Sequence, residues 1–310
     1  MKILVTGGAG FIGSNVVDAF LAAGHEVHAL DNLSHGKRDN LAPGVPLHVM
    51  DIRDKRLVQL LGDERFDLVS HHAAQIDVRH SVSDPLFDAE VNTLGSLNLL
   101  CACVAAGVGK VIYASSGGAI YGEPRYLPCD EDHPIEPVSP YGVSKYTVEQ
   151  YLRQLGAAGG LRFTILRYPN VYGPRQDPLG EAGVVAIFAD RMLRGGEIEI
   201  FGSGEQSRDF LCVVDCARAN LMALDKADGL ALNLGTGTGT TINELFRIMA
   251  RLTGYRLSPL YRPAKPGETM RMALDAERAA RELGWHPSLT LEEGLRLTLA
   301  AMAGGNPPCV

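Results

Sequence analysis

The chain of 310 residues is 46% hydrophobic, enough to bury a large core in one domain or in two interleaved lobes. Its formal charge of −7 offers no basic stripe that would follow a phosphate backbone, so we expect no nucleic-acid partner. The uninterrupted apolar runs are shorter than a bilayer span, and strand-like residues follow the first two directly, so we expect a cytoplasmic protein without a membrane partner.

Short apolar runs rich in β-branched residues alternate with helical patterns along the first half of the chain. This alternation favours right-handed βαβ units and a parallel sheet with both faces covered. We therefore predict an α/β fold with a doubly wound parallel sheet of the Rossmann type. The strand-like runs are 2–6, 26–30, 47–51, 67–70, 110–116 and 162–167, and the helical patterns are 11–24, 85–106 and 141–158.

The second half of the chain loses this regular rhythm. Glycine and proline become frequent after residue 168, and helices are predicted over 183–196 and 241–254. Apolar strand and helix patterns return at 211–236, so this segment is expected to rejoin the first sheet. We predict an NAD-binding domain over 1–168 with 211–236 returning to it, and a smaller interleaved C-terminal α/β substrate lobe over 169–210 and 237–310.

A glycine-rich turn joins the first predicted strand to the first predicted helix. Gly7, Gly10 and Gly13 lie there at GxxGxxG spacing, which allows bare backbone N–H groups to approach a pyrophosphate at the helix N-terminus. Asp31 closes the second strand, where a carboxylate binds ribose hydroxyls and repels a 2′-phosphate, so NAD is favoured over NADP. Asp51 and Ile52 end the next strand and are either an adenine contact or a routine helix cap.

A second motif lies at the start of the helix predicted from residue 141. Ser139 is placed to cap it and Pro140 suits its first position. Tyr141 and Lys145 form a YxxxK pair, which puts both side chains on one helix face. The lysine charge and a positive nicotinamide ring would lower the tyrosine pKa and make it a general base. The alternative is an ordinary amphipathic helix face.

Neither the six cysteines nor the adjacent histidines His71 and His72 suggest a metal site. The sequence contains no CxxC pair, and four cysteines lie in apolar runs, so we expect neither disulfides nor structural zinc. The two histidines follow a strand-like run, where packing beside a ligand or a local hydrogen bond is the simpler interpretation.

With these motifs in place, the chain resembles the extended short-chain dehydrogenase/reductase family, and most closely its UDP-glucose 4-epimerase branch. The resemblance implies NAD-dependent 4-epimerisation of a UDP-hexose, UDP-glucose or UDP-galactose, through a transient 4-keto intermediate. It also implies a homodimer formed by the helices over 85–106 and 141–158. The matching segments are TGGAGFIGS, DNLSHG, DIRD, HHAAQ, EVNTLGSLNLL, SSGGAIYG, SPYGVSK, RYPNVYGPRQ, RDFLCVVD, NLGTG and KPGE.

The resemblance also implies three sets of site residues. The catalytic set is Tyr141, Lys145 and Ser116. The NAD-lining set is Gly7, Gly10, Phe11, Ile12, Gly13, Asp31, Asn32, Ser34, Gly36, Asp51, Ile52, Ala73, Ala74, Asn92, Ser115, Tyr141, Lys145 and Tyr168. The UDP-sugar set is Asn170 for the sugar nucleotide, Val184, Val185, Glu199, Ile200 and Phe201 for uridine, Arg208 for the diphosphate, and Lys265, Glu268 and Met272 in the late motif.

The segment after the strand 110–116 departs from the family. Gly117 stands where the family usually presents a catalytic Ser or Thr, so Ser116 or a water replaces that hydroxyl, or Tyr141 works alone. Dehydratases and decarboxylases of the family carry a carboxylate here, and this chain has Gly117, Gly118 and Ala119, which disfavours both activities.

Three alternative functions stay open at this stage. UDP-N-acetylglucosamine is one substrate, because the flexible Met272 does not decide the pocket size. UDP-glucuronate is another, because Arg175 lies in the loop expected near the sugar, unless that arginine has a structural role. A non-catalytic NAD-binding regulator would be expected to lose Tyr141 or Lys145, and this chain keeps both.

Overall fold

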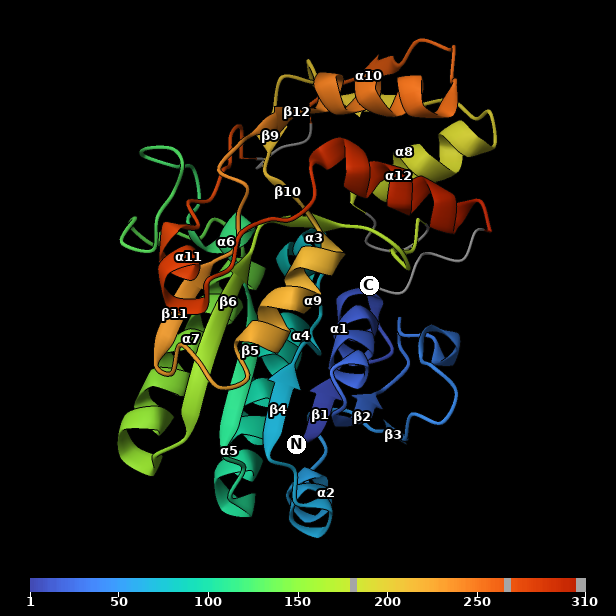
Figure 1. Cartoon of the computed structure of the whole chain (residues 1–310). Coiled ribbons are helices and arrows are strands. Elements are labelled where there is room, and N and C mark those ends of the chain that lie inside the picture. The colour runs from blue at the N-terminus through green and yellow to red at the C-terminus, as the bar shows by residue number, and fades with distance from the viewer. Residues whose placement is uncertain (179–182, 265–268, 305–310) are drawn as a thin grey trace.

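A computed structural model describes residues 1–178, 183–264 and 269–304, and its centre is one parallel sheet. The sheet strands are β1 (Lys2–Thr6), β2 (Glu26–Asp31), β3 (Leu47–Val49), β4 (Leu68–His71), β5 (Lys110–Ser116), β6 (Arg162–Tyr168) and β11 (Leu230–Asn233). They pair in the order β11-β6-β5-β4-β1-β2-β3, and every pair is parallel (Figure 1). The predicted fold class, a doubly wound α/β sheet, is confirmed.

Helices cover both faces of the sheet because its strands are apolar on both sides. In β1, Ile3 and Val5 point into one core cluster and Leu4 into another, as the two-residue period of a strand requires. The first face is covered by α1 (Phe11–Ala22), α9 (Val213–Met222) and α11 (Glu277–Leu283). The second face is covered by α2 (Leu57–Glu64), α5 (Ser96–Ala106) and α7 (Pro140–Gly159).

A smaller lobe with its own core lies over the carboxyl edge of the sheet, where β5 passes into α6 (Gly117–Ile120) (Figure 1). Its helices are α8 (Val184–Leu193), α10 (Ile242–Thr253) and α12 (Leu291–Met302). Its short strands are β7 (Asn170–Tyr172), β8 (Glu199–Phe201), β9 (Ser207–Arg208), β10 (Phe210–Cys212), β12 (Thr240–Thr241) and β13 (Leu260–Arg262). The chain crosses from β10 through α9 to β11, which pairs with β6. The residue boundaries between the two domains stay a prediction.

The helical pattern over 85–106 is interrupted. It consists of α4 (Pro85–Asp88), a π-helical segment η2 (Ala89–Gly95) and α5, and it follows α3 (Val78–Ser83). By length and composition the whole run Pro85–Ala106 is sufficient to cross a membrane, which differs from our expectation that no run reaches a bilayer span. Leu99 and Leu100 on its inner side are buried against the sheet, and a core helix passes the same test of length and composition.

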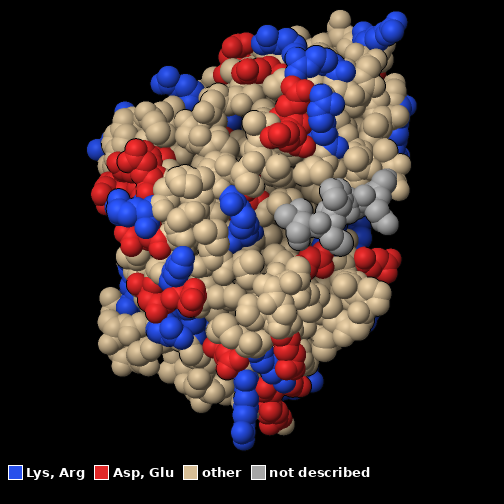
Figure 2. Space-filling view, in the orientation of Figure 1, with Lys and Arg blue, Asp and Glu red and all other residues tan. Residues whose placement is uncertain are grey.

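The outer surface carries charges of both signs. On the face shown in Figure 2, lysines and arginines lie among aspartates and glutamates, with uncharged surface between these groups. A short 3₁₀ turn, η1 (Arg38–Asn40), belongs to the loop between β2 and β3. The five cysteines in the described part of the chain are all free, and Cys309 lies outside the described residues.

Candidate active site

The floor of the candidate site is the carboxyl end of β5, where parallel sheets bind their ligands. Ser116 ends the strand and Gly117 begins α6. A Cβ atom at Gly117 would lie 2.5 Å from the end of the Leu274 side chain, so a serine there would require that side chain to shift. A Cβ at Gly118 would lie 3.8 Å from Asn170 Oδ1, which places the Asn170 amide over the floor.

The N-terminus of α7 delivers the YxxxK pair to this floor. As expected, Ser139 caps the helix by accepting the Gly142 N–H at 3.2 Å, and Pro140 occupies the first turn. The Ser81 hydroxyl of α3 accepts the Tyr141 N–H at 3.2 Å and ties the two helices together. Lys145 Nζ donates to the Ala114 carbonyl of β5 at 3.0 Å and lies 5.8 Å from the centre of the Tyr141 ring.

Burial sets the protonation of both groups. It raises the pKa of the Tyr141 phenol to about 12, while a hydrogen bond from Ser116 acts in the opposite direction. Burial also lowers the pKa of Lys145 to about 8, against the attraction of the Asp88 and Glu149 carboxylates. Burial of the phenol therefore opposes its ionisation, and the predicted lowering of its pKa depends on the positive nicotinamide ring together with the lysine.

Asp88 is a site residue that the sequence did not reveal. Its carboxylate is fully buried and accepts hydrogen bonds from Ser144 Oγ at 2.6 Å, Asn92 Nδ2 at 2.9 Å and Gln75 Nε2 at 3.0 Å. Asn92 also clamps the backbone of Gln75, accepting its N–H at 2.8 Å and donating to its carbonyl at 2.8 Å. This network joins α4, η2 and α7 directly behind the Tyr141 and Lys145 pair.

A buried ion pair supports the other side of the floor, and the sequence did not reveal it either. Arg167 of β6 donates to both carboxylate oxygens of Glu149 on α7, at 3.0 and 2.6 Å, and the two side chains are 4% and 0% exposed. Ser115 Oγ donates to the same carboxylate at 2.6 Å. The Ser115 hydroxyl therefore faces α7, which leaves its backbone as the part available to NAD.

The glycine-rich turn is closely packed at the cofactor end. Gly7 has a φ of +66°, and a Cβ on Gly13 would lie 2.1 Å from the Gly7 carbonyl oxygen, so both positions require glycine. Gly10 supplies no side-chain cap to α1, which leaves the first-turn N–H groups, from Phe11 and Ile12 onward, for an anion. These residues fit the pyrophosphate of a dinucleotide.

The residues expected at the adenosine end meet at the carboxyl ends of β2 and β3. Asp31 accepts the N–H groups of Ala9 at 3.1 Å and Leu33 at 2.8 Å, and Gly36 lies against its carboxylate. Asn32 accepts from Ser34 Oγ at 2.7 Å and donates to Asp51 at 2.9 Å. Hydrogen bonds from Arg53 lower the pKa of the Asp51 carboxyl to about 2. The side chain of the next residue, Ile52, is buried in the core.

The segment after β4 lies against the glycine-rich turn. A Cβ at Gly7 would lie 2.7 Å from the Ala73 nitrogen, which places Ala73 and Ala74 beside the expected cofactor path. Tyr168 behaves differently, because its buried hydroxyl accepts from Asn220 at 2.7 Å and its ring stacks on His72. Its side chain therefore packs towards α9, and only its backbone is available at the strand end.

The two histidines after β4 make local hydrogen bonds. His71 bonds Thr6 Oγ1 at 2.7 Å and Ser96 Oγ at 2.9 Å, and His72 bonds Ser70 Oγ at 2.9 Å. Burial lowers the pKa of His72 to about 3, so it is neutral at physiological pH. These contacts agree with the simpler interpretation of the pair.

The residues expected to bind the UDP-sugar are spread over the smaller lobe. Asn170 begins β7, Val184 and Val185 begin α8, Glu199 and Phe201 bound β8 around Ile200, and Arg208 lies in β9. The side chains of Val185 and Ile200 are buried in the core of this lobe, whereas Met272 is buried in a separate small cluster that includes Ile120 of α6. Glu199 bonds Arg262 at 2.8 Å and Arg191 at 3.5 Å. Lys265 and Glu268 lie outside the described residues.

Arg175 makes a structural contact in the loop after β7. Its guanidinium bonds Asp18 of α1 at 2.5 Å, and the preceding Pro174 carbonyl accepts from Asn15 of the same helix at 3.3 Å. The loop arginine thus fastens the segment after β7 to α1. This contact supports the structural alternative for Arg175, although its buried Nη1 has no hydrogen-bond partner among the described residues.

Known proteins similar to this chain share its whole length. The NAD dependent epimerase/dehydratase family matches residues 3–235. A UDP-glucose 4-epimerase of Mycolicibacterium smegmatis is 43% identical over 305 residues, 96% of this chain and 97% of that protein. The structure of UDP-glucose 4-epimerase from Thermotoga maritima with UDP-glucose has a TM-score of 0.97 at 48% identity, over 98% of this chain and 99% of that one. The Thermus thermophilus UDP-glucose 4-epimerase complex with NAD gives 0.93 at 46% identity, over 99% and 100%.

Proposed function

Since the chain belongs to the NAD dependent epimerase/dehydratase family, we propose that it interconverts UDP-glucose and UDP-galactose by inverting C4 of the hexose. The observation that carries this proposal is the group of Ser116, Tyr141 and Lys145 at the carboxyl edge of the sheet. The residues next to it, Gly117 and Gly118, bring no carboxylate that would protonate a leaving hydroxyl. An epimerase needs no such acid, whereas a dehydratase does.

The chain's own residues supply proton transfer and orientation. Bound NAD supplies the hydride acceptor and donor at C4. Tyr141 Oη takes the proton of the sugar 4-hydroxyl and later returns it, while the Ser116 hydroxyl hydrogen-bonds the phenol oxygen. Lys145, held against the Ala114 carbonyl, stabilises the phenolate by its charge. Because the phenol pKa is raised by burial, the positive nicotinamide ring is needed beside it for the tyrosine to act as a base.

The smaller lobe would hold the nucleotide while the hexose turns over. Asn170 lies over the floor next to Gly118 and is placed for the sugar hydroxyls. Arg208, in the β9–β12 ribbon, would pair with the diphosphate, whose oxygens match a guanidinium fork. This remote binding energy retains the 4-keto intermediate, which must rotate so that hydride returns to its opposite face.

We also propose a homodimer. Leu86 and Leu94 on the α4–η2 run are 77% and 59% exposed, and Val143 and Tyr151 on the neighbouring α7 are also exposed. An apolar face of this kind on two packed helices suits a second copy of the chain. Sedimentation analysis should give a dimer that Leu94→Glu converts to monomer, and a monomeric unmodified protein would exclude the homodimer.

A cytoplasmic location belongs to the proposal, since the described cysteines are free thiols.

The function is tested by a substrate panel. Purified protein is incubated with UDP-glucose, UDP-galactose, their N-acetyl forms and UDP-glucuronate, and NMR detects the C4 epimer. We expect interconversion of UDP-glucose and UDP-galactose, which Tyr141→Phe abolishes while bound NAD is retained. Conversion of only the N-acetyl forms or of the glucuronate would reassign the substrate. Bound NAD without turnover of any of these sugars would contradict the enzyme assignment in favour of a regulator.

A further inference from the structure

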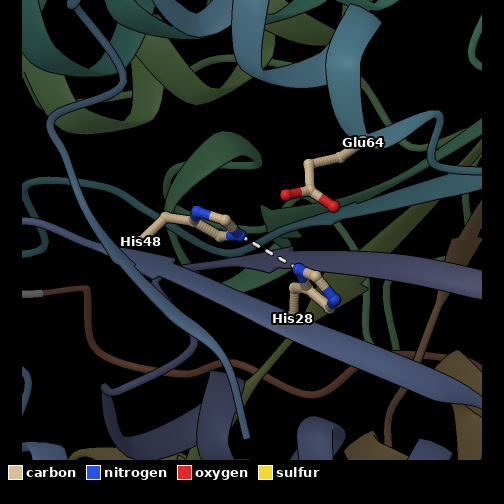
Figure 3. A group of neighbouring side chains, drawn as sticks. All are labelled: His28, His48 and Glu64. Carbon is tan, nitrogen blue, oxygen red and sulfur yellow. Dashed lines mark hydrogen bonds between the residues drawn. The ribbon is translucent and has the colours of Figure 1, made fainter.

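Two histidines and a glutamate converge on the sheet face that α2 covers, away from the candidate active site. His28 of β2, His48 of β3 and Glu64 at the end of α2 each offer a ligand atom, and these atoms lie within 4.8 Å of one another (Figure 3). His28 Nδ1 lies 3.0 Å from His48 Nε2, and the Glu64 carboxylate points towards this pair. His28 is buried, while the other two are half-buried.

A second carboxylate fixes the proton on His28. Its Nε2 lies 3.3 Å from Glu26 Oε1, so this nitrogen carries the hydrogen and donates it. The lone pair is then on Nδ1, which faces His48 and Glu64. A histidine whose outer nitrogen donates to a carboxylate and whose inner nitrogen presents a lone pair is the arrangement found around protein-bound metals. We propose that His28, His48 and Glu64 form a binding site for a divalent transition-metal ion of the zinc class.

The ligand set and its spacing select that class of ion. Two imidazoles and one carboxylate suit Zn²⁺, whereas Mg²⁺ and Ca²⁺ prefer oxygen ligands alone. Two nitrogens bound to one tetrahedral zinc lie about 3.3 Å apart, which is close to the 3.0 Å between His28 and His48. Three protein ligands leave the fourth position to water.

Lys2 is the group that competes with the metal. Its ammonium lies 2.6 Å from Glu64 and 3.5 Å from Glu26, over the ring of Phe66. This ion pair neutralises Glu64 when no metal is bound, and the pair holds the Glu64 pKa below its usual value. A metal ion must displace the ammonium from Glu64, and the nearby Glu26 carboxylate is available to receive it. Removal of the lysine charge should therefore strengthen metal binding.

A metal here would tie the edge of the sheet to its covering helix. The strand β3 has only three residues, pairs with β2 alone, and leads directly to Asp51. The ion would join β3 and β2 to α2, three elements otherwise held by packing and backbone hydrogen bonds. Since only the folded chain brings these ligands together, bound metal should raise the unfolding temperature without being required for turnover.

The experiment uses tag-free protein stripped of metal with a chelator and titrated with zinc chloride. Equilibrium dialysis should give one zinc per chain, and the thermal unfolding midpoint should rise with zinc concentration. The variants His48→Gln and Glu64→Gln should lose both effects, measured against the midpoint of each metal-free variant. Lys2→Met should bind zinc several-fold more tightly. Cobalt chloride gives a second readout, because tetrahedral Co²⁺ absorbs visible light far more strongly than the hydrated ion.

Two control variants separate this site from other surface histidines. His25→Gln removes the imidazole that lies 3.5 Å from the N-terminal amine, and His286→Gln removes an exposed one. Both should bind zinc like the unmodified protein. Binding that survives in His48→Gln, or that disappears in His25→Gln, would overturn the assignment. An unchanged zinc affinity in Lys2→Met would exclude Glu64 as the third ligand.

Discussion

Substitution of Ser116 by alanine tests which hydroxyl assists Tyr141 at the floor of the site. Ser116 is the group that hydrogen-bonds the phenol, and the neighbouring Gly117 carries no hydroxyl. A hydrogen bond to a group that becomes charged contributes about 1.5–3 kcal/mol. If this bond is made in the transition state, Ser116→Ala should lower kcat roughly 10- to 150-fold.

The assay is the conversion of UDP-galactose to UDP-glucose at saturating substrate across a pH series. The Ser116 hydrogen bond lowers the Tyr141 pKa, so the alanine variant should also need a higher pH to reach its maximum rate. Ser116→Thr keeps the hydroxyl and is the matched control. The double variant Ser116→Ala with Gly117→Ser should recover at most part of the activity, because a side chain at position 117 must first displace the end of Leu274. An alanine variant with the original rate and pH profile would refute this role.

Three further predictions follow from the same site. Tyr141→Phe should lower turnover about 100- to 10,000-fold, the usual contribution of a general base, while the purified variant still carries NAD; turnover close to the original would exclude Tyr141. With the Lys145 pKa lowered to about 8, kcat/KM should fall as pH rises through that region, because the ammonium present at lower pH becomes a neutral amine; Lys145→Met should lose this limb along with most activity. Glu149→Gln leaves the Arg167 guanidinium, 4% exposed, without its counter-ion, and urea unfolding should show a loss of about 3–5 kcal/mol. The double variant Glu149→Leu with Arg167→Met should recover most of that loss, and a single variant as stable as the unmodified protein would contradict the argument.

The sequence by itself determined those features whose geometry is local. The turn that begins at Gly7 joins a strand to the next helix, and the four-residue spacing of Tyr141 and Lys145 puts both on one face of α7. The sequence identifies Ser139 as a helix cap for the same reason, since a cap and the N–H donor that it accepts from lie within one turn. Alternation of strand and helix patterns also predicted the parallel sheet. Each of these inferences depends on neighbours a few residues apart.

Only the tertiary structure decided which distant groups act on the site. Asp88 meets Ser144 across 56 residues, and Gly117 faces Leu274, contacts that no periodicity of the chain encodes. Burial, which also arises from packing, raises the Tyr141 pKa, an effect that the YxxxK spacing does not encode.

The same distinction applies to ligands that come from separate elements. The sequence predicted no metal site, because no motif links His28, His48 and Glu64. The pairing of β2 with β3 beneath α2 brings these three side chains together. Arg175 shows the converse. Its place in a loop near β7 suggested a contact with the sugar, and in the folded chain its guanidinium bonds the carboxylate of Asp18. The type of each residue determines its charge and its hydrogen-bonding capacity. The packing of the whole chain determines which partner meets that charge or hydrogen bond.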